Sequence, residues 1–256
     1  PLMIVYIGLA GTALLLFVHR ERRFAVPLFP TSMFHSWTFK AANITHLLIG
    51  SALIIGIVTI PLMANTVLAL SPLEGGLRLM RLTAAIPLGA VLSSILCRHV
   101  DCRIPTFIGL LLSAIGYLLM SSWGTETADP GLTLHLIVTG FGFGLLIVPI
   151  ALAGTESVGE ENRGAAASIV TAMRILGMTL GLATITAWGN VRFQILASDL
   201  TLPIENPGET TIQTENFNSA LNNVGMTLFS EFFLIASCIC LLGLLPTLLM
   251  AWNRNH

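Results

Sequence analysis

Long apolar segments constrain this sequence more than any other feature. A helix needs about 20 apolar residues to cross the hydrocarbon core of a bilayer, and seven segments meet or approach that length. They span residues 1–18, 43–64, 77–97, 104–123, 132–154, 165–188 and 226–251. Only 10% of the residues are charged, against about 25% in ordinary globular domains. The chain is therefore predicted to be all-α and polytopic, with seven transmembrane helices.

The composition also argues against several classes of function. A formal net charge of −1 is unlike that of a basic nucleic-acid-binding surface. The sequence shows no nucleophile–base pair and no metal-ligand spacing, so we predict no enzyme, no metal and no cofactor. The cysteines form no CxxC pair, and we interpret them as inert apolar side chains rather than a disulfide framework. They are Cys97, Cys102, Cys238 and Cys240.

The distribution of basic residues predicts an orientation. If the apolar segments alternate across the membrane, nearly all basic loop residues fall on one side, and Arg192 is the clear exception. The first set is Arg20, Arg22, Arg23, Lys40, Arg98, Arg103, Arg163 and Arg254. Because Lys and Arg concentrate in cytoplasmic loops, we predict a multi-pass protein of the inner or plasma membrane with a cytoplasmic C-terminus. Residues 19–42 then form a basic, amphipathic cytoplasmic connector, and residues 189–225 an exposed loop on the other side.

Sequence motifs occur in residues 61–80, 96–120 and 140–183. The first reads Pro-Leu-x-x-Asn before Ser-Pro-x-x-Gly-Gly-Leu, and the second contains Cys-Arg-x-x-Asp-Cys-Arg. The third contains Arg-Gly-Ala-Ala and Arg-x-Leu-Gly-x-x-x-Gly. In order and spacing they resemble the second half of EmrB/QacA-type drug:proton antiporters, the fourteen-helix branch of the major facilitator superfamily. That family has glutamine at the position of Asn65, and it has glycine and arginine where Cys97 and Cys102 stand here.

The resemblance implies a domain plan and a function. Residues 1–18 would be a linker transmembrane helix, 19–42 the connector, and 43–256 a six-helix C-terminal bundle of two inverted repeats. The N-terminal bundle would be missing, since Pro1 already lies in an apolar segment. The implied activity is proton-coupled efflux of amphipathic or cationic small molecules by alternating access. Its partners would be the lipid bilayer, protons, a small-molecule substrate and the missing half. Two alternatives stay open: a seven-helix receptor or sensor, and an inactive transporter fragment.

Arg174 is the leading site candidate because it interrupts an otherwise apolar segment. A lipid-facing arginine at mid-membrane costs about 2.5–3.5 kcal/mol on insertion scales, so this side chain is expected to face protein or water. One interpretation is a cavity-lining cation that selects substrate or biases proton coupling. The other is an arginine that joins helices through carbonyl or carboxylate partners.

Three further residues are candidates for the substrate or proton pathway. Arg81 lies inside the weakest apolar segment, and Glu231 lies near the predicted start of the last one. We treat Arg81 as a conceivable partner of Glu231, although both could be simple interfacial charges. Asn65 could bond a substrate or cap the end of its helix.

The loop residues Arg98, Asp101 and Arg103 fit two interpretations. In the resembled family such a loop holds a charge network that locks one bundle against the other in one conformational state. The alternative is ordinary positive-inside charge.

Four glycines recur at a spacing of four. Gly140 with Gly144 and Gly177 with Gly181 match the GxxxG pattern, which lets two membrane helices approach closely. We predict that these pairs pack helices.

Overall fold

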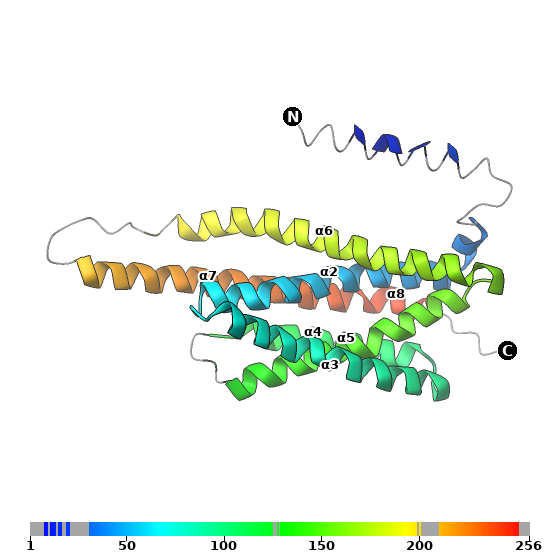
Figure 1. Ribbon diagram of the computed structural model, residues 1–256, viewed down its shortest axis with the longest axis horizontal. Coiled ribbons are helices and arrows are strands. Elements are labelled where there is room, and N and C mark those ends of the chain that lie inside the picture. Colours follow the sequence, from blue (N-terminus) through cyan, green and yellow to red (C-terminus); the bar gives the residue numbers. More distant parts are fainter. Residues whose placement is uncertain are drawn as a thin grey trace.

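The computed structural model describes residues 31–124, 127, 129–198, 200 and 210–250, with scattered residues between 8 and 20. All regular structure in this part is helical, and the long helices run side by side (Figure 1). The elements are η1 (Thr31–His35), α2 (Trp37–Thr66), α3 (Pro72–His99), α4 (Arg103–Ser121), α5 (Asp129–Glu156), η2 (Glu160–Asn162), α6 (Arg163–Ala197), α7 (Thr210–Leu242) and α8 (Leu244–Leu248).

Six of the described helices are long and apolar enough to span a membrane. They correspond in order to the last six predicted segments, while the predicted linker helix 1–18 lies largely outside the described residues. The first of the six, α2, begins at Trp37, earlier than the predicted boundary at residue 43. Ser36 explains the difference, because its side chain accepts a hydrogen bond from the Phe39 amide and caps the helix.

The prediction of an exposed loop over residues 189–225 is wrong for most of that range. α6 continues to Ala197, and α7 already begins at Thr210. At 1.5 Å per residue each of these helices is about 50 Å long, whereas the hydrocarbon core is about 30 Å thick. Figure 1 shows the start of α7 projecting beyond the other long helices, at the end of the bundle opposite α8. In this range low hydropathy therefore indicates that the helices extend beyond the lipid, and it does not indicate that a helix ends.

The helices pack in a pattern that has internal symmetry. α2 packs most extensively along α6, and α3 along α5. α2 and α5 are the most buried of the six helices, whereas α3 and α6 are the least buried. An exchange of α2 with α5 and of α3 with α6 therefore preserves both the pairing and the burial. This is the relation expected of two inverted three-helix repeats.

Aromatic side chains fill the centre of the bundle. Tyr117 of α4 is fully buried, and its ring packs against Phe143 of α5 and Phe233 of α7. Its hydroxyl donates a hydrogen bond of 2.8 Å to the Ala52 carbonyl of α2. One side chain thus connects four helices, and the phenolic O–H has the partner that a buried polar group requires.

Glycines allow α2 and α6, and likewise α3 and α5, to touch backbone to backbone. A Cβ built on Gly177 would come within 3.0 Å of the Leu47 carbonyl of α2, and one on Gly181 equally close to the Ser51 backbone. Between α3 and α5, a Cβ on Gly140 would collide with the Leu82 carbonyl. Gly144 is equally confined, against the Ile86 carbonyl and the Gly89 backbone.

Candidate functional site

The side chain of Arg174 is half-buried about 17 Å along α6. It lies on the helix between Val170 and Gly177, which are both buried, and it is followed by exposed Ile175. Its guanidinium makes no hydrogen bond or ion pair with any other residue that the structure describes. The Arg174 guanidinium is therefore available to donate hydrogen bonds to a group that lies outside the described bundle.

His46 of α2 lies next to this position and is buried, with 2% of its surface exposed. Its Nδ1 is 3.0 Å from the Val170 carbonyl of α6, and its Nε2 is 3.4 Å from the Ile147 carbonyl of α5. A neutral imidazole has one N–H to donate. Because the contact at Nδ1 is the shorter one, we assign the proton to Nδ1, which then donates to the Val170 carbonyl.

Ion pairs join helices at the end of the bundle where α3 and α5 begin, but Arg81 and Glu231, considered as conceivable partners, do not pair with each other. Arg81 of α3 instead donates to Asp129 and to Thr133 of α5. Glu231 accepts a bidentate pair of hydrogen bonds from Arg192 of α6, including one of 2.6 Å from Nη2. Glu231 also lies well inside α7 rather than near its start, because α7 begins earlier than predicted.

We expect the Arg192–Glu231 pair to fasten α6 to α7, because its side chains are only 35% and 24% exposed and its geometry is bidentate. Arg192→Gln and Glu231→Gln should each lower the thermal midpoint of the purified protein, and the double variant should fall no further than the single ones. This non-additivity is the mark of a direct interaction. Glu215→Gln provides the control, since Glu215 lies exposed on the same helix. Additive losses would contradict the pairing.

Asn65 lies exposed at the end of α2. Its side chain is packed beside Gly75 of α3, where an added Cβ would meet the Asn65 Oδ1. The helix end itself is closed by the Val67 amide, which donates to the Met63 carbonyl. Asn65 therefore sits at the α2–α3 junction and is accessible from outside the bundle.

A small cavity lies close to this junction. It has a volume of about 170 Å³ and is lined by residues that include Met63, Arg78, Trp123 and Leu132. The Nη1 atom of Arg78 is buried and has no hydrogen-bond partner among the described residues. The cavity can hold a water cluster or a small acceptor group, but it is too small for a lipid.

Arg98, Asp101 and Arg103 lie between α3 and α4, and two of them interact locally. Asp101 accepts a hydrogen bond of 2.9 Å from the Arg103 amide, and the two side chains form a longer ion pair. The Arg103 guanidinium also donates to the Met250 carbonyl. Arg98 is exposed. The network seen within this bundle thus joins α4 to the C-terminal segment.

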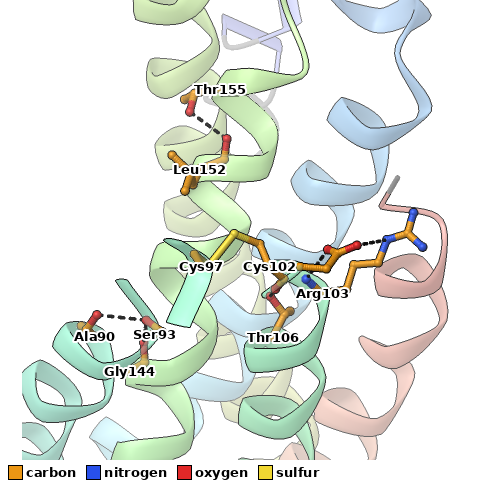
Figure 2. Close-up of a disulfide and its surroundings, with 10 residues drawn as sticks. Ala90, Ser93, Cys97, Cys102, Arg103, Thr106, Gly144, Leu152 and Thr155 are labelled. Carbon is orange, nitrogen blue, oxygen red and sulfur yellow. Dashed lines mark hydrogen bonds and ion pairs between the residues drawn. A yellow bond between two sulfur atoms is a disulfide. The ribbon is translucent and has the colours of Figure 1, made fainter. Parts of the chain in front are cut away.

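The same loop corrects the prediction for two of the cysteines. Cys97, in the last turn of α3, forms a disulfide with Cys102, which occupies the N-cap position of α4 (Figure 2). Cys240 is buried and Cys238 is exposed, and both are free thiols. Sequence spacing missed the bridge because a separation of five residues matches no common motif, while the α3–α4 turn brings the two Cα atoms to 4.9 Å. No three His, Cys, Asp or Glu side chains of the described chain gather closely enough to hold a metal ion.

Comparison with solved structures defines the class to which this fold belongs. The chain matches a bacterial homologue of the human lysosomal transporter Spinster, in its inward-facing and unoccupied conformation, with a TM-score of 0.61. The match covers 88% of this chain and 51% of the other, at 14% sequence identity. The chain therefore shares the helical fold of about half of that transporter chain.

Sequence comparison leads to particular relatives. The chain is 30% identical to the triacylglyceride transporter of Mycolicibacterium hassiacum over 234 residues, which are 85% of this chain and 44% of that one. It is also 30% identical to the triacylglyceride transporter of Mycolicibacterium smegmatis, over 85% of this chain and 41% of the relative. The chain thus spans less than half the length of these relatives. No family model matches the sequence. Both comparisons lead to transporters rather than to enzymes, as predicted.

Proposed function

We propose that this chain forms the C-terminal half of a proton-coupled exporter that moves an apolar or amphipathic molecule by alternating access between two helical bundles. The similarity to named triacylglyceride transporters along 85% of the chain carries the proposal. A seven-helix receptor is disfavoured, because the described helices match half of a transporter. We place the α3–α4 loop and the C-terminus on the cytoplasmic side of the inner membrane, in line with the bias of Lys and Arg.

The substrate class that fits best is a glyceride-like lipid rather than a cationic drug. The half-buried Arg174 disfavours a cationic substrate by charge repulsion and can donate hydrogen bonds to ester or carboxylate oxygens. The small cavity near Arg78 cannot enclose a lipid, so the pathway in this proposal runs between this bundle and a second one. The drug:proton antiporter resemblance contributes the expectation of proton coupling.

Proton coupling is assigned to the second bundle. Among the described residues, Glu231 is paired with Arg192 and Asp129 with Arg81. Other carboxylates, such as Glu74 and Glu156, lie at helix ends. None of these is a free acid at mid-membrane. A coupling carboxylate would therefore come from the other half, and Arg174 would bias its charge.

Transport by the product of the complete gene tests this proposal. In vesicles with an imposed proton gradient, we expect export of a fluorescent triacylglyceride, a loss of export when a protonophore is added, and little movement of ethidium. Export of ethidium but not of the lipid would favour the drug-efflux alternative. Movement of neither compound would contradict the proposed export function.

We expect Arg174→Ala to lower lipid export by about tenfold, because a hydrogen bond to a charged group contributes about 1.5–3 kcal/mol. Arg174→Lys should recover part of the rate. Arg163→Ala is the matched control, since Arg163 lies exposed on the same helix and contacts Glu160 one turn away. Unchanged export by Arg174→Ala would remove this residue from the mechanism.

A further inference from the structure

The Cys97–Cys102 bridge joins two helices that otherwise hardly touch. α3 and α4 both pack on α5, but they have little contact with each other. Near this end Ser93 of α3 donates a 3.4 Å hydrogen bond to the Gly144 carbonyl of α5. The bridge thus adds a covalent side-chain link between the ends of α3 and α4, beside the short turn of residues 100–102 (Figure 2).

The surroundings of the pair favour thiol–disulfide exchange. Cys102 occupies the N-cap position of α4, where the helix dipole stabilises a thiolate, and Arg103 follows it directly. Cys102 is 1% exposed, whereas Cys97 is partly accessible. An external reagent therefore reaches Cys97 first, and Cys102 is placed to resolve the resulting mixed disulfide.

We propose that Cys97 and Cys102 form a redox modification site that clamps α3 to α4 and slows transport when it is oxidised. The oxidant class is a low-molecular-weight disulfide. The Cys97 thiolate attacks it and releases one thiol, and the Cys102 thiolate then attacks Cys97 sulfur and releases the second. The two protein thiols lose two electrons and two protons, and the oxidant becomes two thiols. Because the cytoplasm keeps thiols reduced, the resting state there is the open dithiol.

The clamp is expected to act on α3 because this helix packs mainly on a single neighbour, α5. α3 is among the two least buried of the spanning helices, and Leu88, Val91 and Ile95 on its second half are exposed. A helix held mainly by one neighbour is free to shift when a second bundle moves against it. A covalent bond to α4 removes that freedom at one end. This effect on transport rests on the proposed function, whereas the chemistry of the thiol pair does not.

Thiol trapping in native membrane vesicles from cells that express the gene tests the modification site. After a membrane-permeant reductant, N-ethylmaleimide should label both cysteines. After glutathione disulfide or diamide, the peptide that contains residues 97–102 should be unlabelled and closed, and reductant should reopen it. The free Cys238 serves as the internal control, because it has no thiol partner and should not form an internal bridge. A pair that stays open with oxidant, or stays closed with reductant, would overturn the proposal.

Two readouts then test the clamp itself. Closing the bridge should slow hydrogen exchange of the amides in residues 90–103 several-fold, and it should slow lipid export several-fold. A Cys97→Ser/Cys102→Ser variant should show neither change. Closure with unchanged exchange and export would refute the clamp. Closure with slowed exchange but no export in either redox state would support the clamp and count against the proposed transport function.

Discussion

Gly177→Ala is expected to destabilise the bundle by about 1–3 kcal/mol, the usual cost of overpacking a tight interface. The added methyl group would come within 3.0 Å of the Leu47 carbonyl of α2. Neither backbone can yield without loss of other contacts, because the next turn is held by a 2.8 Å hydrogen bond from Ser51 of α2 to the Gly177 carbonyl. The thermal midpoint of the purified protein in detergent measures the effect.

A matched control separates packing from helix propensity. Alanine is intrinsically the better helix former by about 1 kcal/mol, so propensity alone predicts that Gly177→Ala is stabilising. Gly164, on the same helix, has open space around its Cα. Gly164→Ala should therefore leave the midpoint unchanged or raise it slightly. Equal behaviour of the two variants would show that α2 and α6 do not touch at Gly177.

Hydropathy predicted the spanning helices well, since six of the seven segments correspond to described helices. It failed at the outer ends of α6 and α7. There the helices extend beyond the lipid, and contacts between the two helices stabilise them in place of apolar segments. Gly189, for example, packs against the Phe232 ring, and Arg192 pairs with Glu231. Such contacts depend on residues of the partner helix, and the hydropathy of one segment carries no information about its partner.

The site was harder to predict than the fold because its partners are distant in sequence. Arg81 was recognised as an intramembrane charge, but its partner Asp129 lies 48 residues away on α5. The residues that share a helical face with Arg174 also have different surroundings in the structure. Gly177 and Gly181 face α2, whereas Thr171 is exposed. Helical spacing places residues on a face to within about one turn, and this is too coarse to decide which of them meets a neighbour.

Tyr117→Ala is expected to have the largest effect on stability, with a loss of about 3 kcal/mol or more. In a bilayer the hydrophobic transfer term between helices is small, because lipid is as apolar as the protein interior. The loss comes instead from the van der Waals contacts that the Tyr117 ring makes with Phe143 and Phe233. An alanine side chain is too small to make these contacts and leaves an empty space beside the two rings. A variant of this kind should be recovered in low yield and should unfold at a clearly lower temperature.

Tyr117→Phe separates the ring from the hydroxyl. It keeps the aromatic packing and removes only the hydrogen bond to the Ala52 carbonyl, which should cost about 1 kcal/mol. Ile115→Ala, at an exposed position on the same helix, should change the midpoint little if its side chain faces lipid. The order of stability should therefore place Ile115→Ala nearest the parent, Tyr117→Phe next and Tyr117→Ala last. If Tyr117→Ala unfolded at the same temperature as Tyr117→Phe, the ring would not join the four helices, and the centre of the bundle would have to lie elsewhere.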